Sequence, residues 1–288
     1  MEMNAACGTD SSATETPQAL MTSAVILCFN SARHIRGCVD SIADAYDMAG
    51  IPGDIWVVNN GSVDGSGIAL AELQARHGDR LTVIESPENL GTTRSRNLAL
   101  RRSRGENVLV MDADATIPAE TLKHLLKRMR DDPSIGIVVP KLLYPDGRYQ
   151  LSTDEFPTLW RKLERLLFLR SLENASQGPE TGTDVDYAIS AVWLVRRQVF
   201  SDIGELDEQI FYSPEDVDFC VRVWLGGYRI HYDPSVTAFH DAQELSRAKR
   251  LSRFTLAHIV GLAYYFRKHR YLFSTRRLRK RISAARRP

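Results

Sequence analysis

Residues 107–114 read Asn-Val-Leu-Val-Met-Asp-Ala-Asp, an apolar run that stops at two carboxylates. A short apolar run that ends in a turn is typical of a strand buried on both faces, as in a parallel sheet. Because ligands of such sheets bind at the carboxyl ends of the strands, we expect Asp112 and Asp114 to lie at that edge and not in the core. This stretch therefore predicts both the fold class and the place where a ligand binds.

The same pattern recurs on both sides of this stretch. Further apolar runs lie at residues 24–29, 54–58, 81–84 and 135–140. Segments with helical spacing or turn-bounded helical composition lie between them at residues 32–48, 67–76, 92–102 and 118–130. Strands that alternate with helices form βαβ units, so the sequence predicts an α/β protein with a doubly wound, mixed but mostly parallel sheet flanked by helices.

The second half of the chain is less regular. An apolar-basic helix is expected near residues 159–172, followed by a Gly/Ser/Pro-rich stretch at 174–183 that we interpret as a mobile substrate loop. Later elements are expected as a strand at 186–196, a helix at 215–225, short strands at 228–232 and 236–239, and an apolar helix at 254–266.

Composition excludes several classes of protein. With 43% hydrophobic and 25% charged residues among 288, the chain is neither wholly disordered nor collagen-like. Four scattered cysteines do not form a disulfide framework or a zinc pattern, and a reducing compartment fits them best. No apolar run reaches the ~18 residues of a membrane span, and the N-terminus lacks the pattern of a secretory signal. We expect a cytoplasmic protein.

The net charge of +1 conceals an asymmetry. Residues 250–288 hold 12 Lys and Arg and no acidic residue, which leaves a balance of −11 on the other 249 residues. A basic tail on an acidic body favours an anionic partner for the tail. The acidic body and the lack of a basic-aromatic motif argue against nucleic acid.

Three groups of residues carry candidate chemistry, each with an ordinary alternative. Asp112 and Asp114 fit a divalent cation, or else a solvated turn. Glu215 and Asp216 open a helix, where one carboxylate can act as a general base, or else the pair simply caps the helix. His240 follows a strand and becomes a third metal ligand only if it lies near Asp114.

A fourth stretch fits a diphosphate. Residues 89–97 place Gly91 in a loop and Arg96 in the helix that follows, and a helix N-terminus with arginine suits a pyrophosphate. The dinucleotide-binding GxGxxG pattern is absent after the first strand, and so is the phosphate-binding GxxxxGK[ST] loop.

The order of these motifs resembles the family-2 glycosyltransferases of the GT-A fold, and within them the rhamnosyltransferase-like bacterial enzymes. The resemblance covers roughly residues 22–245. It rests on Val25–Asn30, Val57–Ser66, Asn89–Asn97, Asp112-Ala113-Asp114, Glu215–Arg222 and His240. It implies a GT-A catalytic domain over 22–245, with a nucleotide-sugar-binding half (22–140) and an acceptor-binding half (141–245), between a disordered leader (1–21) and a C-terminal apolar helix with a basic tail (246–288).

The resemblance also implies roles for single residues. Asp112 would contact the donor ribose, and Asp114 would bind Mg²⁺ or Mn²⁺ at the donor diphosphate, with His240 completing the metal site. Asp216 would be the catalytic base, supported by Glu215. The remaining donor-pocket residues implied by the resemblance are Phe29, Asn30, Gly91 and Arg96.

Two positions depart from the family pattern. The family usually has Asp where this chain has Asn59, which puts recognition of the nucleobase in question, although an amide still offers a donor and an acceptor. The family commonly has Gly where Ser190 stands, near the expected acceptor site. Trp193, just beyond it, either stacks on an acceptor sugar or is a core residue.

The expected function is an inverting, metal-dependent glycosyltransferase that moves a sugar from a nucleotide-diphosphate sugar, dTDP-rhamnose or a UDP-sugar, to a glycan or lipid-linked acceptor. The alternatives are a sugar-nucleotide nucleotidyltransferase and a glycosyltransferase for a natural-product or peptide acceptor. The tail over 250–288 either lies on an anionic membrane, at the inner face of the cytoplasmic membrane, or packs on the catalytic domain.

Overall fold

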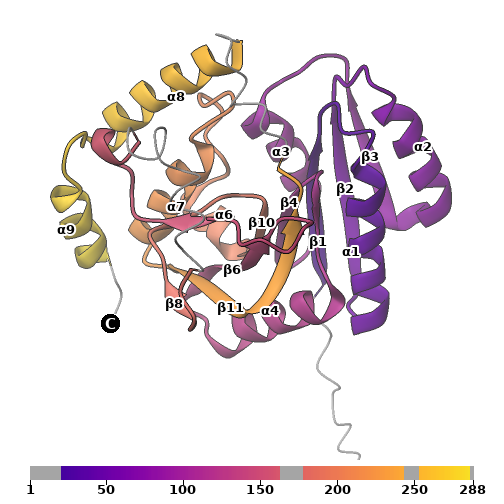
Figure 1. The fold of residues 1–288 in the computed structure, drawn as a ribbon, viewed down its shortest axis with the longest axis horizontal. Helices are drawn as coiled ribbons and strands as arrows, with labels where there is room; N and C mark the ends of the chain where they lie inside the picture. Colours follow the sequence, from indigo (N-terminus) through magenta and orange to yellow (C-terminus); the bar gives the residue numbers. More distant parts are fainter. Residues whose placement is uncertain (1–20, 163–177, 243–252, 286–288) are drawn as a thin grey trace, which may run out of the picture.

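The computed structural model describes residues 21–162, 178–242 and 253–285 (Figure 1). The expected leader, the helix beyond residue 162 and the first part of the expected mobile loop lie outside these residues. The described chain forms one large sheet with helices on both faces and a small two-stranded sheet beside it. This is the α/β class predicted from the sequence.

The first half of the large sheet is parallel. Its strands lie in the order β3-β2-β1-β4, and each neighbouring pair runs in the same direction. The strands are β1 (Thr22–Cys28), β2 (Gly53–Asn60), β3 (Leu81–Ser86) and β4 (Asn107–Asp112). The helices that connect them are α1 (Ile35–Ala49), α2 (Ser66–His77) with the short η1 (Gly78–Arg80), and α3 (Thr92–Leu100).

The second half continues the same sheet with mixed directions. The strand β10 (Val192–Arg196) lies antiparallel between β4 and β6 (Ile135–Leu143), and β11 (Arg229–His240) lies parallel to β6. The short strands β5 (Ala115–Thr116) and β8 (Thr183–Asp184) pair with β11. The small sheet joins β7 (Thr153–Asp154) to β9 (Tyr187–Ala188).

Three expected strands differ from the observed ones. The strands expected at 228–232 and 236–239 form the single strand β11, whose pairing with β6 is interrupted between Asp233 and Thr237. The strand expected over 186–196 is divided into β9 and β10. In both places the local pattern identified strand character but not the irregularity within it.

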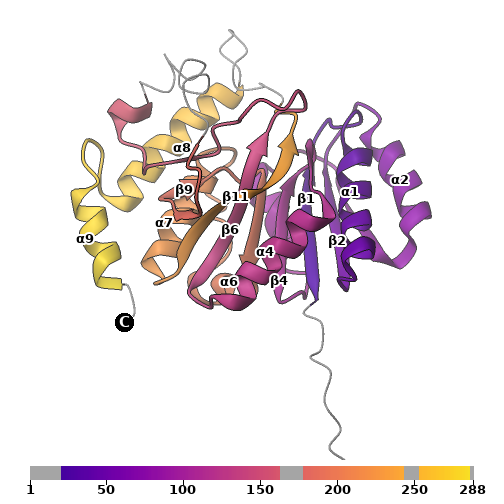
Figure 2. The same cartoon turned by 60° about the horizontal axis from the view of Figure 1, so that its bottom comes forward.

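Two apolar layers hold the helices on the sheet. One face carries α1, α2 and α4 (Ala119–Asp131), whose buried side chains share a core cluster with the strands. The other face carries α3, α6 (Arg197–Ile203) and α7 (Glu215–Leu225). Figure 2 shows the sheet between these layers, with α8 (Arg253–His269) and α9 (Arg276–Ala285) on the side of α7.

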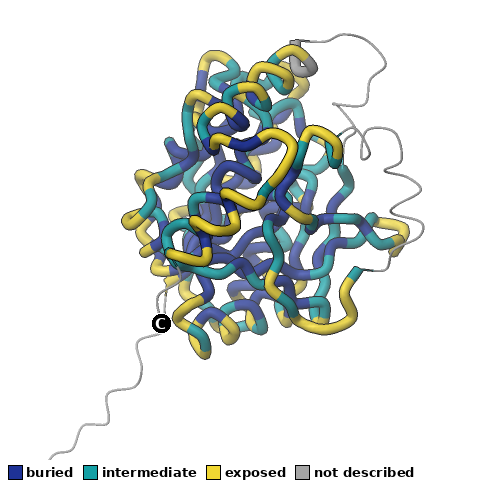
Figure 3. The backbone as a smooth tube through the Cα atoms, turned by 90° about the vertical axis from the view of Figure 1, so that its left-hand side faces the viewer, coloured by how far each residue is buried: buried dark blue, intermediate teal, exposed yellow. Residues whose placement is uncertain are grey.

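The C-terminal helices are part of the folded body. Tyr265 and Phe266 of α8 and Leu278 and Ile282 of α9 are buried in the same core cluster as α7. The outer surfaces of both helices are exposed (Figure 3). No helix in the described ranges is long and apolar enough to cross a membrane. The helices α8 and α9 thus pack on the catalytic domain, which was one of the two interpretations of the tail. Each helix also has an exposed side.

Candidate functional site

Three potential metal ligands meet at the carboxyl edge of the sheet. Asp112 is the last residue of β4, Asp114 follows two residues later, and His240 ends β11. Pairing of His240 with Ala115 brings the three together, although β11 comes much later in the chain. One ligand atom from each residue lies within 4.8 Å of the other two. The geometry places His240 beside Asp114, the condition under which the sequence made it a candidate metal ligand, and adds Asp112 to the same cluster.

The imidazole of His240 is held in one orientation. Its Nδ1 lies 2.9 Å from Oε1 of Gln150, so its Nε2 faces the carboxylates, 3.3 Å from Oδ1 of Asp114 and 3.8 Å from Oδ2 of Asp112. Burial opposes protonation of His240, but the hydrogen bond to Asp114 and the charge of Asp112 outweigh it and raise the pKa. The same negative field attracts a cation, and an oriented imidazole with two carboxylates fits an ion such as Mn²⁺.

Arg96 connects this cluster to the start of α7. It is only 1% exposed, and its guanidinium forms an ion pair with Asp112, donates to Oγ of Ser190 at 2.7 Å and lies 3.7 Å from Oε1 of Glu215. The hydroxyl of Ser190 supplies an acceptor that a glycine would lack. In this structure the guanidinium of Arg96 contacts protein groups, and its place in the donor pocket stays a prediction.

Glu215 and Asp216 lie at the N-terminal end of α7, across from the metal-ligand cluster. Burial and the charge of Asp216 raise the pKa of Glu215 to about 8, against the lowering effect of Arg96. Glu215 is therefore protonated at neutral pH. Oδ1 of Asp216 accepts a hydrogen bond from the backbone N–H of Val217 at 2.7 Å. Two adjacent carboxyl groups with different environments are typical of a site that divides acid and base roles.

The sequence did not single out Tyr212 or Gln150. Burial, followed by the charges of Glu215, Asp112 and Asp216, raises the pKa of Tyr212 to about 12, so its phenol remains neutral among these carboxyl groups. Because Tyr212 lies only three residues before Glu215, the sequence could have identified it as a neighbour of the candidate base. Gln150 had none, because only the fold brings it to His240.

In the half of the domain predicted to bind the donor, hydrogen bonds join the loop after β1 to the loop after β2. The backbone N–H of Asn30 donates to Oγ of Ser62 at 3.0 Å, and Oδ1 of Asn30 accepts from the N–H of Val63 at 2.9 Å. Asn30 has φ of +50°, a left-handed conformation that Asn adopts more readily than most residues. Phe29, half-buried, precedes it at the end of β1. Both residues lie at the predicted edge.

Asn59 is buried at the end of β2 with half of its amide paired. Its Nδ2 donates to Oε2 of Glu85 at 2.8 Å, and its Oδ1 has no hydrogen-bond partner among the described residues. Because a carboxylate only accepts, the amide nitrogen must face Glu85 and the oxygen must point away from it. A buried acceptor without a partner is costly, and a ligand that donates to it would remove that cost.

Gly91 allows the start of α3 to approach the chain near Phe211. It has φ of +84°, and a Cβ atom at this position would lie 2.4 Å from the carbonyl oxygen of Phe211. The N–H of Thr92 donates to the same oxygen at 2.7 Å. Gly91 therefore holds the segment that leads to α7 as well as lying at the predicted donor edge.

Trp193 lies in the core and not at the rim. It is 1% exposed and stacks on Phe219 with ring centroids 5.8 Å apart. This is the core alternative weighed from the sequence, and in this position the ring offers no surface to an acceptor sugar.

A model described as Glycosyl transferase family 2 matches residues 23–204. The chain belongs to this family. The match ends before Glu215, Asp216 and His240, so the roles of these residues rest on the geometry and on the resemblance of the motifs.

Members and structural neighbours of the family agree with the fold. The chain is 24% identical over 220 residues to an N-acetylglucosaminyltransferase of Rhizobium sp. (strain N33), covering 74% of this chain and 47% of the relative. It resembles GalNAc-T7 with UDP, GalNAc and Mn²⁺ at a TM-score of 0.63 and 14% identity, covering 86% of this chain and 48% of the other.

A second solved structure is the mannosyltransferase PcManGT from Pyrobaculum calidifontis in complex with GDP-Man and Mn²⁺, with a TM-score of 0.56 and 18% identity over 93% of this chain and 74% of the other. These similarities show that the chain has the GT-A fold. The chain spans about half the length of the Rhizobium relative.

Proposed function

We propose that this family 2 chain is an inverting glycosyltransferase that moves a sugar from a nucleotide-diphosphate sugar to an acceptor hydroxyl in bacterial glycan synthesis. One observation carries the proposal. A cluster suited to a divalent cation (Asp112, Asp114 and His240) and a carboxyl pair suited to proton transfer (Glu215 and Asp216) lie at one edge of the sheet, joined through Arg96.

The unpaired oxygen of Asn59 supports a uracil or thymine nucleotide as the donor. Both bases carry an N3–H donor, which would satisfy the buried Oδ1 of Asn59. The oxygen therefore takes the place that an aspartate carboxylate has in most of the family. A UDP-sugar and dTDP-rhamnose both meet this requirement, and the rhamnosyltransferase-like branch remains our prediction for the sugar.

The donor diphosphate would lie at the metal-ligand cluster. Asp114 and His240 would hold Mg²⁺ or Mn²⁺ with Asp112 beside them, and Mn²⁺ is the ion in two structural neighbours. When bound, the ion supplies positive charge that stabilises the leaving diphosphate. Arg96 holds the carboxylate of Asp112 in place, because its guanidinium is buried and paired with that carboxylate.

Asp216 is proposed as the base. It accepts the proton of the acceptor hydroxyl while that oxygen bonds to the anomeric carbon, and the bond from this carbon to the diphosphate oxygen breaks with its electron pair. Attack from the face opposite the leaving group inverts the anomeric carbon in one step. Glu215, protonated at neutral pH, does not compete for this proton and limits the negative charge beside Asp216.

Thermal stabilisation by nucleotides tests the donor site. UDP, dTDP, GDP and their sugars are added with Mn²⁺, Mg²⁺ or EDTA, and a ligand at 100 times its Kd should stabilise the protein by ~2.7 kcal/mol. We expect a metal-dependent shift with UDP or dTDP that is lost in His240→Ala and kept in the control His77→Ala. A lack of any metal-dependent shift would contradict the proposal.

The products separate transfer from the nucleotidyltransferase alternative. A glycosyltransferase releases a nucleoside diphosphate and a glycosylated acceptor. A nucleotidyltransferase joins a nucleoside triphosphate to a sugar-1-phosphate with release of pyrophosphate, and with added pyrophosphate it returns the sugar-1-phosphate from the nucleotide sugar. A panel of glycan, lipid-linked, natural-product and peptide acceptors identifies the acceptor class. Detection of sugar-1-phosphate instead of transfer would favour the alternative enzyme.

A further inference from the structure

The exposed face of α8 changes from apolar to basic along its length. Leu256, Ile259 and Val260 are 60%, 54% and 59% exposed, Arg267 is exposed further along the same helix, and Arg270 is exposed just beyond its last residue, His269. Leu256, Ile259, Val260 and Arg267 are spaced to share one side of the helix, opposite the buried Tyr265. We call the five exposed residues the α8 strip.

An exposed aromatic pair lies beyond the C-terminal end of α8. Trp160 and Phe273 are 65% and 59% exposed, and their ring centroids are 6.3 Å apart. The backbone N–H of Leu159 donates to the carbonyl oxygen of Leu272 at 2.9 Å, which holds the two segments together. A hollow of about 410 Å³ is lined by Phe266, Arg267, Arg270, Tyr271 and Leu272, so the aromatic pair is continuous with the α8 strip.

Three arginines in this region have no acidic partner among the residues that the structure describes. A pocket of about 300 Å³ between α8 and α9 is lined by Arg270, Tyr271, Ser274, Arg276 and Arg277. No ion pair joins the guanidinium groups of these three arginines to a carboxylate among the described residues, whereas the neighbouring Arg279 pairs with Asp186 at 2.7 Å.

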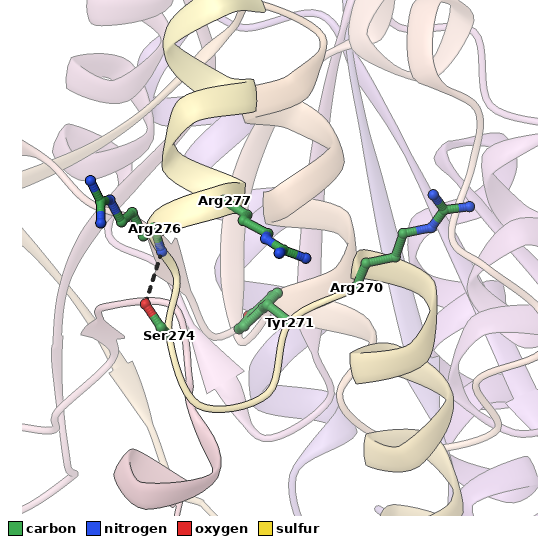
Figure 4. A pocket seen from close by; sticks show the side chains of 5 residues that line it. All are labelled: Arg270, Tyr271, Ser274, Arg276 and Arg277. Atoms are coloured by element: carbon green, nitrogen blue, oxygen red, sulfur yellow. Dashed lines mark hydrogen bonds between the residues drawn. The ribbon is translucent and has the colours of Figure 1, made fainter.

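The arginine side chains diverge and do not enclose one point. Figure 4 shows Arg277 reaching from α9 into the space beside Tyr271, while Arg276 and Arg270 extend outward on either side. The backbone N–H of Arg276 donates to Oγ of Ser274 at 3.3 Å. This arrangement suits several phosphate groups spread over a surface better than one phosphate in a closed pocket.

We propose that the α8 strip, the Trp160–Phe273 pair and Arg276 and Arg277 form a docking surface for an anionic phospholipid bilayer. Exposed aliphatic and aromatic side chains enter the interfacial region of a bilayer, and adjacent arginines bind anionic headgroups. The charge of the partner follows from residues 250–288, which contain 12 basic residues and no acidic one. Nucleic acid matches the charge but not the exposed aliphatic residues.

The position of this surface gives it a use. Figures 1 and 2 show that α8 begins at the end of the molecule where β11 ends, and His240 is the last residue of β11. A bilayer bound along α8 would therefore lie beside the edge of the sheet that carries the proposed active site. Docking on a bilayer requires neither donor nor metal, so it is independent of the proposed function.

Co-sedimentation with vesicles tests the proposal on the full chain. The vesicles contain phosphatidylcholine alone or with 30 mol% phosphatidylglycerol, at low and at high salt. We expect binding to the anionic vesicles that weakens with salt, and a roughly 100-fold weaker partition for the triple variant Arg270→Glu, Arg276→Glu, Arg277→Glu, since each basic residue contributes about fivefold. Trp160→Ser with Phe273→Ser should weaken binding at either salt concentration.

A matched control separates this surface from overall charge. The triple variant Arg104→Glu, Lys123→Glu, Arg130→Glu changes the net charge equally at exposed positions away from α8 and α9, and should bind like the wild type. Equal loss in both triple variants would overturn the proposal, as would equal binding of all proteins. Stabilisation by inorganic phosphate without vesicle binding, or tighter binding of an oligonucleotide than of vesicles, would also overturn it.

Discussion

Gly261 of α8 lies directly against the backbone of Ser213, where a Cβ atom would be only 2.2 Å from the carbonyl oxygen of Ser213. Ser213 and Pro214 immediately precede Glu215 and Asp216 at the start of α7. Further along the same helix, Lys268 and His269 pair with the buried carboxylate of Asp218 in α7. The helix α8 therefore supports the segment that leads to the proposed base, Asp216.

The first prediction concerns Gly261→Ala. The added methyl group meets a backbone oxygen, which cannot move aside as a flexible side chain can, so α8 and the Ser213 segment must separate. We expect a loss of about 1–3 kcal/mol in the free energy of unfolding and a lower kcat, with donor binding little changed. Chemical denaturation and initial rates measure these. The exposed substitution Ala263→Gln on the same helix is the control, and equal behaviour of both variants would refute a supporting role for this contact.

The second prediction concerns Asp216→Asn. An amide cannot accept the proton of the acceptor hydroxyl, so kcat should fall by about 10²–10⁴-fold. Donor-dependent thermal stabilisation should persist, because Asp216 is not a member of the metal-ligand cluster. The exposed Asp131→Asn on α4 controls for the change of residue type. Near-normal transfer by Asp216→Asn would remove it from the mechanism.

The third prediction concerns stability at acid pH. Burial opposes ionisation of Asp218, but the hydrogen bond from His269 and the charges of Arg222 and Lys268 outweigh it and lower the pKa to about 2. Asp218 and Arg222, one turn apart on α7, form an ion pair at 3.0 Å. A lowered carboxyl pKa stabilises the folded state above the ordinary value near 4, and this contribution is lost as the pH falls toward 2.

Urea denaturation between pH 5 and pH 2 measures this contribution. The wild type should lose about 2 kcal/mol more over this range than Asp218→Asn, which has no proton to take up at this position. At pH 7 the variant should be less stable, since its cations lose their buried partner. Parallel pH profiles for the two proteins would show that Asp218 does not carry the effect.

The fourth prediction concerns selection of the base by Asn59. UDP and CDP differ at the pyrimidine edge, where uracil carries an N3–H donor and cytosine presents an acceptor. We expect the wild type to bind UDP about tenfold more tightly than CDP, because the N3–H of uracil can donate to Oδ1 of Asn59, whereas N3 of cytosine cannot. Isothermal titration with Mn²⁺ measures both constants. Asn59→Ala should abolish the preference, and Glu85→Gln should weaken it, because an amide at position 85 can also donate and no longer fixes the orientation of the Asn59 amide. A preference that survives in Asn59→Ala would assign selection elsewhere.

The sequence predicted most of the parallel half of the fold because its signals are local. Each strand of that half is a short apolar run, and the observed helices differ from the predicted ones by a few residues at their ends. The antiparallel insertion of β10 could not be predicted in the same way, because strand order depends on contacts between distant segments. The helix α9 was missed because its basic residues obscure two buried positions, Leu278 and Ile282.

In the candidate site too, residues with a local signal could be predicted and contacts between distant segments could not. Asp112, Asp114 and Glu215 were recognisable because each follows a strand or starts a helix, where polar residues reach the edge of the sheet. The role of Arg96 was not, since a helical arginine read alone gives no sign that it will be buried between two carboxyl groups. The orientation of His240 by Gln150 likewise depends on a contact that no sequence spacing encodes.

Pairing of His240 with Ala115 has a consequence for the order in which the enzyme matures. The ribosome completes the two aspartates long before it reaches the histidine, and β11 follows the helix that carries the proposed base. A nascent chain that has emerged only as far as residue 204 would hold neither Asp216 nor His240. Tight binding of a metal ion would thus begin only when β11 pairs with β5, so metal binding would report that the last strand has folded correctly. An incomplete chain would lack the proposed base as well, and it would not transfer sugar from the donor.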